Sequence, residues 1–313
     1  MPAPVRPPMA QGSCASVARV TLTDDIRAAA ARVAREARHV RIEHDAIESY
    51  ARTLPVESPP TPDLAGADDE TRAAFSLQLN AINFGSGWFP TINKPQGLSG
   101  FRTIEAALRA RGPWTAAELK GLARSEVAAT FGQDPDHVLM AHFARHLNEL
   151  GERIDGSFLG FARSHDSVED LATTLASWPT WHDVSPYPSG EVPFYKRAQI
   201  AAGDLALARL GPTTGLDRLT LFADNLVPHV LRVDGVLGFD DDLVARIDGG
   251  VLLEHDSPEE VEIRAVALHA VELLVHAHPG NTTASALDWV LWTRGAQPRY
   301  KARPRHRAPT TAY

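Results

Sequence analysis

The sequence has very little cysteine and lacks the long apolar runs of membrane and secreted proteins. Cys14 is the only cysteine among 313 residues, which excludes an intrachain disulfide, a cysteine zinc cluster and a redox pair. No stretch is long and apolar enough to cross a bilayer, and the proline-rich residues 1–11 lack the core of a signal peptide. These absences predict a soluble cytoplasmic protein with no membrane partner.

Motifs that hold phosphates, metals or nucleophiles are also missing. The chain has no glycine-rich phosphate loop of the Walker or dinucleotide type and no Gly-x-Ser-x-Gly elbow. His142 and His146 are spaced like the first and last ligands of a zinc-protease motif, but Phe143 stands where that motif has glutamate, and no third ligand is marked. We therefore expect no metal and no other cofactor.

Charge is distributed unevenly along the chain. The formal net charge of -8 argues against a surface built for duplex nucleic acid. Residues 289–313 nevertheless contain no acidic residue and six basic ones: Arg294, Arg299, Lys301, Arg303, Arg305 and Arg307. Such a segment is usually a solvated tail, and less often a strap that binds anions. We expect no stable nucleic-acid partner, while the basic segment keeps open a module that binds modified tRNA without catalysis.

Helix signals dominate the pattern, and at least eight helices are marked. They include a pattern over residues 24–54 that Pro55 ends, capping boxes at Thr115 with Glu118 and Ser167 with Asp170, an Asp134-Pro135 start to a helix that Gly151 ends, and a Ser257-Pro258 start to a very apolar helix. Strand evidence is confined to residues 230–237, which could form a hairpin or an irregular connection. The sequence predicts a flexible segment over residues 1–22 and an all-α, single globular domain over residues 23–313. Two helical lobes with a cleft between them would fit this pattern.

Two runs each place a charged residue among aromatic and apolar neighbours. Lys196 lies within residues 193–199, and Asp224 lies within residues 219–228. Burial removes hydration, so such a charge needs a partner, a shifted pKa or a ligand. The two groups could compensate each other around an anionic substrate or form a buried salt bridge, and the residues alone leave both readings open.

A third run, residues 79–90, combines glycines with aromatic residues. Gly85 and Gly87 would let the backbone approach another group closely, and Phe84 and Trp88 offer flat apolar faces. Stacking of a planar heterocycle on such a face contributes roughly 1–3 kcal/mol per ring. A turn packed into the core by its own aromatic residues is the alternative.

A second carboxylate in apolar surroundings, Asp288, lies within residues 284–292. If Asp224 and Asp288 face one pocket, they suit a reaction with an oxocarbenium-like state. One carboxylate would orient or deprotonate water, and the other would offset positive charge or anchor a cationic group. The alternative is that Asp288 pairs with Arg294 or another arginine of the basic segment.

Together these runs resemble the queuosine salvage family of queuosine 5'-phosphate N-glycosylase/hydrolases. The resemblance spans nearly all of the chain after about residue 26 and rests on residues 83–89, 193–199, 219–228, 262–265, 270–272, 287–292 and 304–307. It implies a helical fold similar to DNA glycosylases. It also implies hydrolysis of the N-glycosidic bond of queuosine 5'-monophosphate without a metal, which releases the 7-deazaguanine base queuine and ribose 5-phosphate.

The resemblance also implies roles for individual residues. Asp224 would be the catalytic carboxylate that stabilises a ribosyl cation or activates water, and Lys196 would lie close to it and to the ribose phosphate. Asp288 would hold the polar edge of the base or the amine of its cyclopentenediol arm. The candidates for stacking are Phe84, Trp88, Phe194 and Tyr195, and the candidates for further substrate contacts are Asn83, His229 and Arg305.

Two departures from the family pattern bear on the substrate. The family commonly has Tyr-Arg after the catalytic aspartate and then a Val-Pro-Gln-like segment, whereas Asn225 and Leu226 stand here and His229 follows Val-Pro. The C-terminal residues 308–313 also lack the arginine and paired tyrosines usual there. Both differences leave open a preference for the nucleoside or another 7-deazaguanine derivative.

Overall fold

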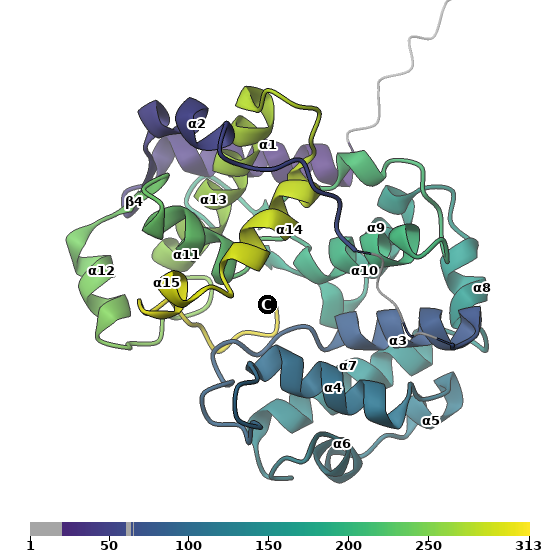
Figure 1. Ribbon diagram of the computed structural model, residues 1–313. Coiled ribbons are helices and arrows are strands. Elements are labelled where there is room, and N and C mark those ends of the chain that lie inside the picture. Colours follow the sequence, from purple (N-terminus) through teal and green to yellow (C-terminus); the bar gives the residue numbers. More distant parts are fainter. Residues whose placement is uncertain (1–20, 61–63, 65) are drawn as a thin grey trace, which may run out of the picture.

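A computed structural model describes residues 21–60, 64 and 66–313 of the chain (Figure 1). The predicted flexible segment, residues 1–22, and Cys14 lie outside these residues, except that Thr21 caps the first helix and Leu22 begins it.

Helices make up most of the described structure, as the sequence predicts. The α-helices are α1 (Leu22–Glu36), α2 (His44–Ala51), α3 (Asp69–Ala81), α4 (Gly100–Arg111), α5 (Ala116–Lys120), α6 (Arg124–Phe131), α7 (Val138–Arg153), α8 (Phe158–Arg163), α9 (Val168–Ala176), α10 (Lys196–Leu207), α11 (Leu226–Val233), α12 (Asp241–Asp248), α13 (Pro258–Ala277), α14 (Ala284–Arg294) and α15 (Pro298–Lys301). Two 3-10 turns, η1 (Pro179–Trp181) and η2 (Leu216–Arg218), and two short antiparallel pairs, β1 (Val40–Ile42) with β4 (Leu237–Phe239) and β2 (Val184–Ser185) with β3 (Val192–Pro193), complete it. The all-α fold class is confirmed, and likeness to DNA glycosylases stays a prediction.

Side-chain caps begin several helices where the sequence marks them. Thr115 and Glu118 form the reciprocal capping box of α5. The hydroxyl of Ser167 accepts from the backbone N–H of Asp170, at 3.0 Å, at the start of α9. Ser257 caps α13 in the same way, and Pro258 occupies its first turn. These three predicted helix starts are confirmed.

The single helix predicted over residues 24–54 is wrong, because a tertiary partner divides it into α1, β1 and α2. The carboxylate of Glu262, on α13, accepts backbone N–H groups from Arg38, His39 and Val40 at 3.0, 2.7 and 3.1 Å. Donors that would continue a helix are thereby held in an extended segment, which pairs with β4.

The hairpin considered for residues 230–237 is also wrong. Val227, Val230 and Leu231 follow helical spacing and are buried, so residues 230–233 belong to α11. The strand β4 pairs with β1 instead, with Val40 opposite Phe239.

Gly151 does not end a helix, and Asp134 does not begin one. Helix α7 starts after a turn capped by Asp134 and runs through Gly151. A Cβ atom at Gly151 would lie 2.6 Å from the Cβ of Leu119 on α5. Glycine is therefore required for the close packing of α5 on α7 and not as a stop signal.

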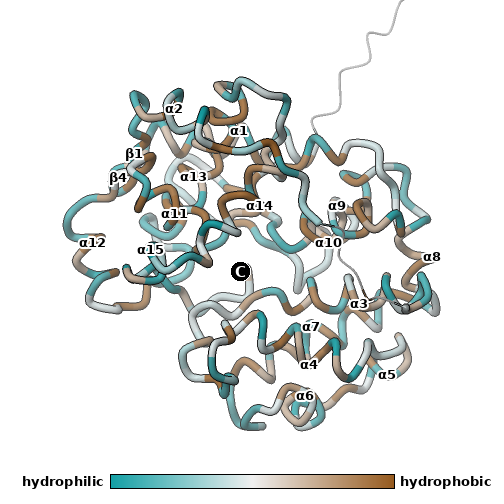
Figure 2. Tube along the Cα trace, viewed as in Figure 1, coloured by the Kyte–Doolittle hydropathy of each residue, from teal (hydrophilic) through white to brown (hydrophobic). Residues whose placement is uncertain are grey.

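The buried apolar residues form two large clusters, which define two lobes. One core, from Ala73 to Leu219, lies among α3 to α10 and defines the central lobe. The other unites residues 26–54 with residues 192–300 and defines the terminal lobe, where hydrophobic stretches of α11, α13 and α14 stand out in Figure 2. The chain passes from one core to the other between Phe194 and Ala198, and again between Leu219 and Leu221.

The C-terminal segment is not a solvated tail, because it runs inward between the two lobes (Figure 1). The N–H of Gly85 donates to the carbonyl of Tyr313 at 3.0 Å, and Tyr313 is only 2% exposed. A Cβ atom at Gly87 would lie 2.3 Å from the carbonyl oxygen of Ala308. The close approach that the glycines allow is therefore made by the chain's own C-terminal segment.

Within the part of the chain that the structure describes, no helix combines the length and the apolar character needed to cross a membrane.

Replacing Glu262 by alanine is expected to lower the free energy of unfolding by about 2–3 kcal/mol, because three backbone donors lose their acceptor. Chemical denaturation of the Glu262→Ala and Glu262→Gln variants measures this. The glutamine variant keeps an acceptor oxygen and should lose less than half as much. Equal losses in the two variants would show that side-chain volume, and not these hydrogen bonds, divides residues 24–54.

Candidate active site

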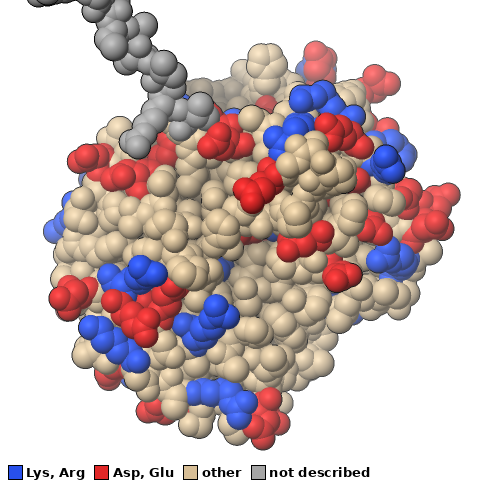
Figure 3. Space-filling model, turned by 180° about the vertical axis from the view of Figure 1, so that it is seen from behind, with Lys and Arg blue, Asp and Glu red and all other residues tan. Residues whose placement is uncertain are grey.

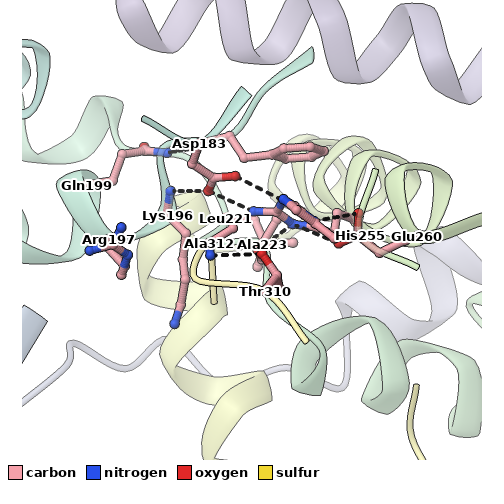
Figure 4. Close-up of polar contacts among 12 residues, drawn as sticks. Asp183, Lys196, Arg197, Gln199, Leu221, Ala223, His255, Glu260, Thr310 and Ala312 are labelled. Carbon is pink, nitrogen blue, oxygen red and sulfur yellow. Dashed lines mark hydrogen bonds and ion pairs between the residues drawn. The ribbon is translucent and has the colours of Figure 1, made fainter. Parts of the chain in front are cut away.

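Lys196 is the first residue of α10 and is only 6% exposed. It follows Tyr195, whose φ of 47° lies in the left-handed region and turns the chain from β3 into the helix. The backbone N–H of Lys196 donates to Asp183 Oδ2 at 3.1 Å, while its Nζ donates to the carbonyl of Asn83 at 2.9 Å. The side chain therefore extends from the start of α10 to the loop after α3, and the ammonium group points away from Asp183 (Figure 4).

Burial lowers the pKa of the Lys196 ammonium to about 8. The charges of Asp224 and Asp288 oppose this effect, while Arg197 and Arg264 add to it. Both predicted carboxylates thus act electrostatically on the predicted lysine. The lysine remains mainly protonated at neutral pH and loses its charge just above it.

Asp224 directly precedes Asn225, the N-cap residue of α11, and is half-buried. Its Oδ1 accepts from the backbone N–H groups of Leu226 and Val227 at 2.7 and 3.3 Å. A carboxylate is favourable at this helix N-terminus because free N–H groups and the helix dipole face it. Among the described residues, no hydrogen bond engages its Oδ2, which leaves one oxygen free for a substrate.

Asp288, on α14, is 9% exposed, and its Oδ1 accepts from the N–H of Phe222 at 3.2 Å. Burial, followed by the charge of Asp224, raises its pKa well above the usual range of a carboxyl group. The alternative of a pair with Arg294 is wrong, because Arg294 lies 3.9 Å from Asp234 instead. Burial and the neighbouring Asp224 thus favour the protonated form of Asp288, an environment that can give the two carboxyl groups separate roles.

The predicted stacking residues divide into two groups. Trp88 and Tyr195 are partly exposed, and Tyr195 packs against both cores. Phe84 and Phe194 are buried, so neither presents an open face to a substrate in this structure. The ring of Phe84 contacts His146 at a centroid distance of 4.5 Å, and the guanidinium of Arg264 covers Phe194 at 3.9 Å.

The remaining predicted contact residues differ in how they relate to Lys196 and Asp224. Asn83 contacts Lys196 directly, since its carbonyl and Oδ1 both accept from Lys196 Nζ. Arg305 lies on an exposed part of the C-terminal segment, within range of the charge of Asp224. His229 is buried on α11, and its Nε2 lies 2.8 Å from the carbonyl of Tyr300, so its contact is with the chain itself.

Two buried residues to which the sequence analysis gave no role contact the backbone next to Lys196 and Asp224. Arg264, on α13, contacts the carboxylate of Asp183 with two nitrogens, at 3.0 and 2.8 Å (Figure 4). Arg264 could have been noticed as a lone arginine in the apolar part of residues 258–277. Asp183 follows an aromatic stretch without any motif, so nothing in the sequence marks it.

The candidate histidine metal pair lies in a packed environment. The ring of His142 contacts Trp88 at 5.2 Å between centroids, and burial lowers the pKa of His146 well below its usual value. Elsewhere in the described residues, ligand atoms of His255, Asp256 and Glu260 lie within 4.8 Å of one another. The two ring nitrogens of His255 face different carboxylates, with Nε2 3.4 Å from Asp256 and Nδ1 3.6 Å from Glu260.

The basic segment is tied to the body of the protein. Arg299 pairs with Asp234 at 2.9 Å, and Arg294 lies near the same carboxylate. Figure 3 shows the molecule from behind, where basic and acidic side chains are interspersed over the surface. Part of the positive charge that a tRNA-binding strap would use is therefore neutralised within the protein.

Comparisons with known proteins identify the family of this chain. The family model described as queuosine salvage protein matches residues 65–313. A protein of Sphaerobacter thermophilus is 33% identical over 310 residues, covering 90% of this chain and 95% of its own length. Proteins of Dictyostelium discoideum (33% over 196 residues, 58% and 60% covered) and Bos taurus (31% over 169 residues, 47% and 50% covered) are also similar. All three are named queuosine 5'-phosphate N-glycosylase/hydrolase. The chain therefore belongs to the queuosine salvage protein family.

Proposed function

We propose that this protein hydrolyses the N-glycosidic bond of queuosine 5'-monophosphate and releases queuine and ribose 5-phosphate. The observation that carries the proposal is that Asp224 and Asp288 both lie within electrostatic range of the Lys196 ammonium in a member of this family. In the reaction, the bond between the anomeric carbon and the base breaks with its electron pair going to the base. Water then supplies a hydroxyl to the sugar and a proton to the base.

Asp224 would stabilise the ribosyl cation as the bond breaks, or orient the attacking water. Its Oδ1 is held by α11, so its Oδ2 can face the sugar in a fixed position without reorganisation. A charge fixed in this way, partly shielded from solvent, acts more strongly than one in bulk water.

Lys196 would contact the ribose 5-phosphate group. Asn83 holds the ammonium through its carbonyl, and a phosphate would replace the hydration that burial removes. The same positive charge lies within electrostatic range of Asp224.

Asp288 would bind the polar edge of the base. A protonated carboxyl group both donates and accepts hydrogen bonds, which matches the donors and acceptors of a guanine-like edge better than it matches a cationic amine. Trp88 and Tyr195 are the remaining candidates to stack on the base, since their side chains are partly exposed.

Base release tests the proposal directly. Purified protein, without added metal, is incubated with queuosine 5'-monophosphate or queuosine, and free queuine is quantified by chromatography. We expect release from the nucleotide. Tight binding of either compound without any release would contradict the proposal and leave a binding module, the alternative considered from the sequence. We also propose a cytoplasmic location, in keeping with the single cysteine.

The pH dependence of kcat/KM is expected to show a basic limb near pH 8. The pKa of Lys196 is lowered to about 8, so the proposed phosphate ligand is protonated below this pH and neutral above it. Activity should therefore fall as the pH rises through this value. A profile that stays flat up to pH 10 would remove the charge of Lys196 from the mechanism.

A further inference from the structure

We propose that Arg264 and Asp183 form a positioning pair that fixes the distance between Lys196 and Asp224. The inference rests on the proposed function, since it concerns the geometry of that same site. Neither residue need touch the substrate, because Asp183 acts through the backbone N–H of Lys196 and Arg264 acts through the carbonyl of Ala223, the residue before Asp224.

Asp183 holds the start of α10. This helix has no side-chain cap of its own, because its N-cap is Tyr195 in the left-handed conformation. Asp183, thirteen residues before Lys196, supplies acceptors to this turn of the chain. Its Oδ2 accepts from the N–H of Lys196 at 3.1 Å, and its carbonyl accepts from the N–H of Phe194 at 2.9 Å.

Arg264 connects Asp183 to the loop that carries Asp224. Its two terminal nitrogens contact the carboxylate of Asp183, and its Nε donates to the carbonyl of Ala223 at 3.1 Å. Ala223 is the residue directly before Asp224. One planar guanidinium therefore bonds both to Asp183, which accepts the N–H of Lys196, and to the residue before Asp224 (Figure 4).

The surroundings of Arg264 fix its orientation as well as its contacts. Its guanidinium lies over the ring of Phe194 at 3.9 Å and over the ring of Tyr313 at 4.8 Å. Arg264 is fully buried, as is the side chain of Asp183. A buried ion pair costs desolvation and is weak evidence for stability, so its geometry is the property that an apolar pair could not replace.

Lysine could not reproduce this arrangement. It would keep the positive charge, but a single ammonium group cannot hold both carboxylate oxygens and a carbonyl in one plane. The segment of Lys196 or that of Asp224 would then move, and a displacement of about 1 Å costs on the order of 10²-fold in rate.

The test compares Arg264→Lys and Asp183→Asn with wild-type protein in the base-release assay. We expect kcat to fall about 10²-fold in both variants, with KM changed by less than about threefold, because positioning affects the transition state more than binding. The matched control is Arg246→Lys, which alters a half-exposed pair with Glu259 and should keep wild-type kcat.

The outcomes separate the two proposals. An inactive wild type would contradict the proposed function. An active wild type with unchanged kcat in both variants would overturn only the positioning role. Circular dichroism and thermal unfolding are measured alongside, and loss of the native fold in both variants would also overturn it, since the proposal requires folded enzymes with lowered kcat. Loss of kcat in one folded variant only would equally contradict a pair acting together.

Discussion

Replacement of Asp224 by asparagine is expected to abolish queuine release while leaving the fold intact. The carboxylate is proposed to stabilise positive charge on the ribose, and removal of such a group costs roughly 4 kcal/mol in the barrier, or about 10³-fold in kcat. The expected result is a variant with at least this loss in the base-release assay.

The fold should survive because asparagine keeps the local hydrogen bonds. Its side-chain oxygen can accept from the N–H groups of Leu226 and Val227, as Asp224 Oδ1 does. Asp217→Asn is the matched control, because Asp217 is an exposed carboxylate seven residues earlier and should be replaceable without effect. An Asp224→Asn variant that retained a tenth of wild-type kcat would exclude this carboxylate from the chemistry.

Replacement of Lys196 by methionine is expected to lower kcat/KM for the nucleotide by about 10²-fold, because a charge-assisted contact to phosphate is lost from a buried site. Methionine has nearly the same length and no charge, so the packing around α10 should change little. The loss on queuosine, which has no phosphate, should be much smaller.

The ratio of the two losses identifies the role of Lys196. Lys301→Met, in the exposed part of the basic segment, is the control and should leave both substrates unaffected. Equal losses on nucleotide and nucleoside would place Lys196 beside Asp224 alone, and not at the phosphate.

The sequence was most informative where a residue's role depends on its immediate neighbours. Capping residues such as Thr115 and Ser167 are local signals, and they begin helices as predicted. Lys196, Asp224 and Asp288 could be singled out because a charge within an apolar run is costly wherever the run is buried.

Features that depend on distant partners could not be predicted in this way. Residues 24–54 read as one helix because Glu262, which divides them, lies more than two hundred residues away. Gly85 and Gly87 indicated a close approach but not that the C-terminal segment makes it. Phe84 and Trp88 are equally aromatic, and only the fold buries the first and leaves the second partly exposed.

The central claim is that Asp224 lies beneath the anomeric carbon of the bound sugar. A crystal structure of the Asp224→Asn variant with queuosine 5'-monophosphate tests it most directly, because a slowed enzyme retains the intact substrate. We predict that the side chain at position 224 lies within about 3.5 Å of the anomeric carbon, with the Lys196 ammonium at the phosphate. A nucleotide bound with its ribose away from position 224, and that side chain turned to solvent, would contradict the account.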